Sequence, residues 1–134
     1  MNRHDMLRTV EDAYAARVRG DLDGVMRAFS NTAALQMNAT PSHPSLAYFT
    51  EDTSALRTAM SELIDTFTFS DLQIIDSVVE GSKAVVRSRF TVQAKPTGKS
   101  ARTEILDLFE FKDGKIVSMT QFCDTALAAQ LLNK

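Results

Sequence analysis

The sequence predicts an α+β protein in which N-terminal helices pack on a curved antiparallel sheet. In the first half, apolar residues recur at spacings of three and four, which is the periodicity of amphipathic helices. The second half is rich in Val, Ile, Phe and Thr and is divided by short turns that contain glycine or proline. Because helical and strand segments do not alternate, the pattern favours α+β over a parallel α/β sheet.

Length and composition predict one domain covering residues 1–134, without metal or disulfide support. The single cysteine, Cys123, excludes an intrachain disulfide and agrees with a reducing cytoplasm, as does a start without the features of a secretory signal. Basic and acidic residues are intermixed and give a net charge of −2. Without a basic stripe or a long apolar run, we expect neither nucleic acid nor a membrane as partner.

The first predicted helix covers Arg3 to Arg19 and ends at Gly20. Its apolar residues define one buried face: Leu7, Val10, Tyr14 and Val18. Asp21 can cap a second short helix that runs to Phe29, with its apolar residues turned inward.

A short strand, Thr32–Met37, follows and ends in a loop that contains Pro41 and Pro44. Asp52 or Thr53 can cap a third helix. That helix carries another apolar stripe: Leu56, Met60, Leu63, Ile64 and Phe67.

The remaining chain predicts four strands linked by hairpins, and then a short helix at Thr125–Leu132. The predicted strands are Ser70–Val79, Lys83–Ala94, Ala101–Lys112 and Lys115–Cys123. The segments EGSK, KPTGK and KDGK between them have hairpin-turn composition, so the strands form an antiparallel meander.

Strand register decides which side chains share a face, because neighbouring side chains point to opposite faces. Centring the middle hairpin on residues 96–98 pairs Val86 with Phe109, Ser88 with Asp107, and Phe90 with Ile105. One face is then apolar apart from Ser88 and Asp107. The opposite face carries Arg87, Arg89, Thr91, Glu104, Leu106 and Leu108.

An aspartate in an apolar face is expected to have a raised pKa, because burial disfavours the carboxylate. Asp107 could therefore stay protonated and donate a hydrogen bond to a developing oxyanion. The alternative is an aspartate that is satisfied by a neighbouring partner and performs no chemistry.

Either of two alternating sets of side chains on the last strand could face Asp107, depending on the turn that precedes the strand. A two-residue Asp113–Gly114 turn would turn Thr120, Phe122 and Asp124 toward the Asp107 face. A bulged turn would place Met119, Gln121 and Cys123 there instead.

The segment Gly20–Gly24, Phe29 and the later run LDLFEFKDGKIVSM resemble the NTF2-like superfamily, which includes ketosteroid isomerase and SnoaL-like polyketide cyclases. The resemblance covers nearly the whole chain. It implies a cone-shaped α+β fold around a pocket for a hydrophobic small molecule. It also implies a homodimer formed through the outer face of the sheet, where the apolar Leu106 and Leu108 would fit such an interface.

The resemblance also implies roles for single residues. Ketosteroid isomerase combines a general-base aspartate with an oxyanion hole made of a tyrosine and a protonated aspartate. Asp107 matches the protonated aspartate, and Tyr14 lies one residue from the tyrosine position, which Ala13 matches. Met37 stands where the base belongs, and methionine cannot take a proton, so steroid isomerase chemistry is not expected.

The ending DTALAAQLL resembles that of SnoaL-like proteins, in which a pocket aspartate acts as general acid and base. Asp124 is the candidate for that role; alternatively, it caps the last helix. The isomerase-like run GKIVSM favours the bulged turn, with Gln121 inward. We expect six residues to contact the ligand: Met37, Ser88, Ile105, Phe109, Met119 and Gln121.

No metal or cofactor is expected, because the sequence has no ligand spacing or phosphate-binding motif. Three hypotheses remain open. The first is a cofactor-independent isomerase, cyclase, dehydratase or epoxide hydrolase that uses Asp107, Asp124 and Tyr14. The second is a non-catalytic binder of an apolar metabolite. The third is a protein-interaction module of the same fold.

Overall fold

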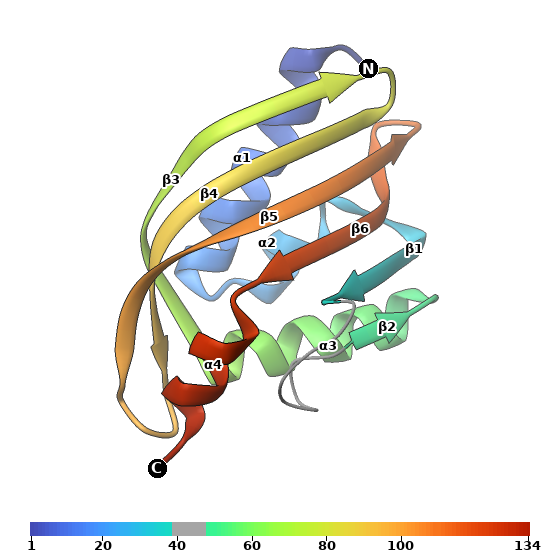
Figure 1. Cartoon of the computed structure of the whole chain (residues 1–134). Coiled ribbons are helices and arrows are strands. Elements are labelled where there is room, and N and C mark those ends of the chain that lie inside the picture. Colours follow the sequence, from blue (N-terminus) through green and yellow to red (C-terminus); the bar gives the residue numbers. More distant parts are fainter. Residues whose placement is uncertain (39–47) are drawn as a thin grey trace.

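The computed structural model describes residues 1–38 and 48–134, and its strands form one curved sheet in the order β2-β1-β6-β5-β4-β3 (Figure 1). The elements are α1 (Arg3–Arg19), α2 (Leu22–Met26), β1 (Phe29–Met37), β2 (Tyr48–Thr50), α3 (Thr53–Thr66), β3 (Phe67–Glu80), β4 (Lys83–Ala94), β5 (Ser100–Lys112), β6 (Lys115–Cys123) and α4 (Thr125–Leu132). The α+β prediction, with its antiparallel meander, is confirmed. The predicted loop with Pro41 and Pro44 lies outside the described residues.

Helix α1 has the predicted bounds because both of its ends carry strong signals. The Asn2 side chain accepts a hydrogen bond from the Asp5 amide, and Gly20 ends the helix with a φ of 73°. Val18, predicted to be buried, is 37% exposed. Two four-residue steps from Val10 rotate it by about 80° around the helix, away from the buried face.

Helix α2 is shorter than predicted, and Phe29 already begins β1. Asp21 caps α2 by accepting from the Gly24 amide at 2.9 Å. A Cβ atom on Gly24 would lie 2.8 Å from the Cβ atom of Ala16 in α1. The glycine therefore allows α2 to approach α1 closely.

The predicted pairing of β4 with β5 is wrong by two residues. The Ala94 amide bonds to the Lys99 carbonyl around a four-residue loop, in which Gly98 has a φ of 75°. The pairs in this hairpin are Val86 with Asp107, Ser88 with Ile105, and Phe90 with Thr103. Because the shift is by two residues, every side chain keeps its predicted face. The inner face of β4 and β5 is apolar apart from Thr103 and the fully buried Ser88 and Asp107.

The β5–β6 hairpin combines features of both predicted alternatives. Lys112 pairs with Lys115 around a two-residue turn, and the register then shifts by one residue between Glu110 and Phe111. This bulge brings Gln121 opposite Asp107, so the favoured inward orientation of Gln121 is confirmed.

The sequence did not predict how β1 joins the sheet. It runs parallel to β6, with Met37 beside Gln121, and β2 forms the edge next to it. Helices α1 and α3 lie on the concave side of the sheet, and α4 lies at one end (Figure 1). No helix among the described residues is long and apolar enough to cross a membrane.

Candidate functional site

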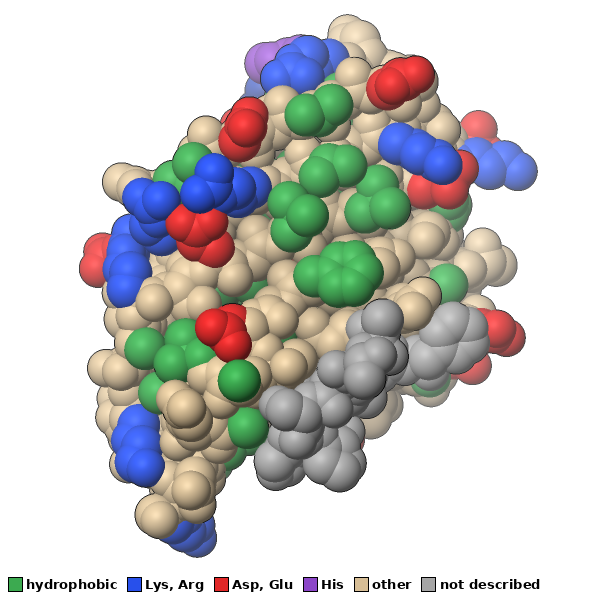
Figure 2. Space-filling model, viewed as in Figure 1, with side chains coloured by type: hydrophobic (Ala, Val, Ile, Leu, Met, Phe, Trp, Pro, Cys, Tyr) green, Lys and Arg blue, Asp and Glu red, His purple; other side chains and the backbone are tan. Residues whose placement is uncertain are grey.

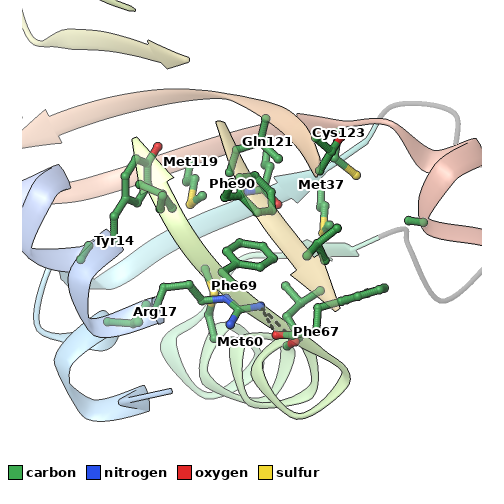
Figure 3. Close-up of a pocket in the computed structure, with 18 of the residues that line it drawn as sticks. Tyr14, Arg17, Met37, Met60, Phe67, Phe69, Phe90, Met119, Gln121 and Cys123 are labelled. Carbon is green, nitrogen blue, oxygen red and sulfur yellow. Dashed lines mark hydrogen bonds between the residues drawn. The ribbon is translucent and has the colours of Figure 1, made fainter. Parts of the chain in front are cut away.

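A cavity of about 100 Å³ lies between the concave face of the sheet and helices α1, α3 and α4, and it opens to solvent (Figure 3). Its wall is formed mainly by aromatic, aliphatic and methionine side chains. The polar and charged residues that line it are Tyr14, Arg17, Thr103, Gln121 and Asp124. An apolar wall with few polar groups is typical of a small-molecule site.

Five of the six residues predicted to contact a ligand line this cavity: Met37, Ile105, Phe109, Met119 and Gln121. Ser88 lies behind the wall. Its side chain is fully buried, and its interaction with the Tyr14 hydroxyl partly opposes the rise of the Tyr14 pKa. A contact between Ser88 and a ligand therefore stays a prediction that this geometry does not favour.

Tyr14, Asp107 and Gln121 form a buried hydrogen-bonded group at the cavity wall. The Tyr14 hydroxyl donates to Oδ2 of Asp107 at 2.5 Å, and Nε2 of Gln121 donates to Oδ1 at 2.9 Å. Three elements supply these side chains: the inner face of α1, the middle of β5, and β6 beyond its bulge. The position of Tyr14 on α1, one residue from the family's tyrosine, still brings it to Asp107.

Burial sets the electrostatics of this group. It raises the pKa of Asp107 to about 6, although the hydrogen bonds from Tyr14 and Gln121 oppose the rise. Burial and the neighbouring Asp107 raise the pKa of Tyr14 far above its ordinary value. Tyr14 is therefore a permanent hydrogen-bond donor, whereas Asp107 can change its protonation state near neutral pH.

Asp107 does not itself line the cavity. Its side chain is fully buried, and both carboxyl oxygens accept hydrogen bonds from residues that do line it. A ligand would meet Tyr14 and Gln121 first. The geometry thus gives Asp107 a role that acts through Tyr14, rather than direct contact with a ligand.

Asp124 caps the last helix and also lies in the cavity wall. Its Oδ1 atom accepts from the Leu127 amide at 3.0 Å and so caps α4. It is exposed, and it also lines the cavity. Among the described residues, no hydrogen bond connects it to Tyr14 or Asp107.

The SnoaL-like domain family matches residues 10–119. The chain belongs to this family. No curated protein matches the sequence at a significant level.

Solved structures with the same fold cover nearly the whole chain. An NTF2-like protein of unknown function from Burkholderia pseudomallei has a TM-score of 0.82, with 20% identity and 100% of both chains covered. A candidate isomerase from Bacillus subtilis has a TM-score of 0.86, with 14% identity over 98% of this chain and 95% of that one. A candidate polyketide cyclase from Xanthomonas campestris has a TM-score of 0.77, with 17% identity over 99% and 100%. At these identities the likeness shows the NTF2-like fold.

Within this SnoaL-like fold, sequence reasoning missed Arg17. It lines the cavity from α1, one helical turn from Tyr14. The signal was present, because residues three apart share a helix face. The predicted stripe considered apolar residues and treated charged ones as surface.

Residues 1–38 and 48–134 of this SnoaL-like domain contain no cluster of side chains that could bind a metal ion. No group of three His, Cys, Asp or Glu side chains there could hold an ion.

Proposed function

We propose that this SnoaL-like protein binds a small apolar molecule in its cavity and performs cofactor-independent acid/base chemistry on it, as an isomerase, cyclase or dehydratase. One observation carries the proposal. The Tyr14 hydroxyl, at the wall of a mainly apolar cavity, is hydrogen-bonded to a buried carboxyl group whose pKa is raised to about 6.

The Tyr14–Asp107 hydrogen bond can run in either direction. When Asp107 is ionised, the phenol donates to it. When Asp107 takes up a proton, the carboxyl can donate to the phenol oxygen, and the Tyr14 O–H is released toward the cavity. There it would donate to a ligand oxygen on which negative charge develops, in surroundings that strengthen the interaction.

Asp124 is our candidate for the second acid/base group. Only its Oδ1 atom is used in capping α4, so Oδ2 can exchange a proton with a ligand at the cavity mouth.

Proton exchange on a panel of cyclic ketones in D2O, followed by NMR, tests this chemistry without knowledge of the natural substrate. The wild type should accelerate exchange next to the carbonyl group, and Tyr14→Phe should slow it about 100-fold. The rate that depends on Tyr14 donation should fall as the pH rises through 6, because Asp107 then loses its proton. Exchange that is equal in wild type and Tyr14→Phe would refute the mechanism.

A non-catalytic binder is the second candidate, and Met37 favours it. Met37 stands in the cavity wall and cannot take a proton, and Asp107 is screened from the cavity. A metabolite retained in native mass spectrometry and released unchanged would support binding without turnover.

We also propose a homodimer formed through the outer face of the sheet. Figure 2 shows apolar side chains gathered at the centre of that face, and the exposed ones include Leu106, Leu108 and Phe122. Leu106 and Phe122 are cross-strand neighbours, so they form one continuous patch. The cytoplasm is the proposed compartment, since a single cysteine fits a reducing environment.

A further inference from the structure

Arg17 places a positive charge in the wall of the apolar cavity. From α1 its Nη2 atom donates to the carbonyl oxygens of Leu63 and Phe67, at 3.2 and 2.7 Å (Figure 3). The centre of its guanidinium lies 3.9 Å from the centroid of the Phe69 ring. The side chain is therefore held in one position by the end of α3, the start of β3 and an aromatic ring.

No carboxylate balances this charge among the described residues. The ion pairs of the described chain use four other arginines: Arg19, Arg57, Arg87 and Arg89. Burial lowers the pKa of Arg17 to about 10, so it stays positive at neutral pH. A partly buried cation without a counter-ion is unfavourable, and an anionic ligand would remove that cost.

The anchoring of Arg17 also leaves hydrogen-bonding capacity unused. A guanidinium has five N–H groups. Both hydrogen bonds to carbonyl groups come from Nη2, and neither Nε nor Nη1 donates to any residue that the structure describes. Anchoring to the end of α3 therefore uses only part of the hydrogen-bonding capacity of the Arg17 guanidinium. The remaining N–H groups, on Nε and Nη1, can each donate a single hydrogen bond to a carboxylate oxygen.

The rest of the wall limits the ligand to one charged group. Besides Arg17, the charged residue that lines the cavity within the described chain is Asp124, which is exposed and would repel an anion from the mouth. The body of the ligand would lie against aromatic side chains such as Phe69 and Phe90. The cavity volume of about 100 Å³ is below the roughly 150 Å³ that holds a benzene ring, so a ligand of one ring would fill the cavity and extend into its open mouth.

We propose that the ligand is an apolar carboxylic acid of about one ring, with its carboxylate bound by Arg17 and its body in the aromatic part of the cavity. This inference rests on the proposed function, because it takes the same cavity as the ligand site. It adds the class of ligand, which the Tyr14–Asp107 group alone does not define.

Binding of 3-phenylpropionate and its neutral isostere 3-phenylpropionamide, measured by calorimetry at pH 7.5, tests the proposal. The wild type should bind the carboxylate at least about tenfold more tightly than the amide. Arg17→Met keeps an apolar side chain and removes the charge, so it should reduce this preference to less than about twofold. Arg19→Met, on the exposed side of the same helix, is the matched control and should retain the preference.

Arg17→Met could also weaken the junction between α1 and α3, so two further measurements are included. Arg17→Lys keeps the charge and loses the fixed, planar N–H groups of the guanidinium, and should show an intermediate preference. In the wild type, the NMR signal of the Arg17 Nε–H group should shift with the carboxylate and not with the amide.

The outcomes separate this inference from the proposed function. Equal binding of the acid and the amide by the wild type would overturn the inference and leave the cavity as a ligand site. A preference for the acid that survives in Arg17→Met, with no shift of the Arg17 signal, would also overturn it. Binding of neither compound would refute both the acid ligand and a cavity of this size as the binding site.

Discussion

Replacing Asp107 with asparagine should change how stability depends on pH. Asp107 is fully buried, and its pKa is raised from 3.8 to about 6. That difference corresponds to about 3 kcal/mol between the protonated and ionised forms of the folded state. Asparagine has nearly the same shape and can keep both hydrogen bonds if the amide of Gln121 flips, so the variant should fold.

The direction of this change in stability with pH follows from how many protons Asp107 binds in the folded and unfolded states. Well below pH 3.8, Asp107 is protonated in both the folded and the unfolded chain, and its burial adds no charge penalty. Above pH 6 it is ionised in both, and the folded state contains a buried carboxylate. Relative to Asp107→Asn, the wild type should therefore lose about 3 kcal/mol of stability as the pH rises from about 3.5 to 7.5.

Urea unfolding followed by circular dichroism, at intervals from pH 3.5 to 7.5, measures this difference. Subtracting the variant from the wild type removes the contributions of all other titrating groups, and Asp113→Asn controls for the loss of one charge. A difference that stays constant within about 1 kcal/mol would refute a raised pKa. A wild type that gains stability with rising pH would mean that the hydrogen bonds from Tyr14 and Gln121 outweigh burial.

Three other substitutions test separate parts of the structure. Tyr14→Phe removes the donor to Oδ2 of Asp107, so it should cost about 1–3 kcal/mol in urea unfolding and raise the Asp107 titration midpoint in carbon NMR. Gly24→Ala should destabilise the protein by about 1–3 kcal/mol in thermal unfolding, because the new Cβ would lie 2.8 Å from that of Ala16. An unchanged melting temperature would contradict that packing. Leu106→Arg should convert the proposed dimer to monomer in light scattering, and a wild-type monomer would refute the interface.

The sequence predicted the elements well because their signals are local. Gly20 and the aspartate caps end and begin helices through their own backbone geometry and hydrogen bonds. The residues on the inner face of β4 and β5 were also predictable. Side chains alternate between the two faces of a strand, so an error of two residues in the pairing leaves each side chain on the same face. The exact partner of Asp107 was not, because it depends on the four-residue loop closed by Ala94 and Lys99.

Long-range relations were the part that sequence patterns could not supply. Nothing local in β1 indicates that it pairs in parallel with β6, more than 80 residues later. The contact of Tyr14 with Asp107 spans 93 residues and depends on the tilt of α1 across the sheet. The spacing of Arg17 from Tyr14 placed both on one face of α1, but its anchoring could not be predicted, because the acceptor carbonyl groups of Leu63 and Phe67 belong to the backbone.

The bulge in the β5–β6 hairpin has a consequence for how this family can diversify. Deleting one residue at the bulge would exchange the two faces of the rest of β6 in a single genetic event. Gln121 would then leave the site, and Phe122, now on the outer surface, would enter it. The loss of one codon would thus exchange a polar side chain of the cavity for an aromatic ring and remove that ring from the outer face. Relatives that differ in length at this hairpin should therefore differ in ligand and in assembly together.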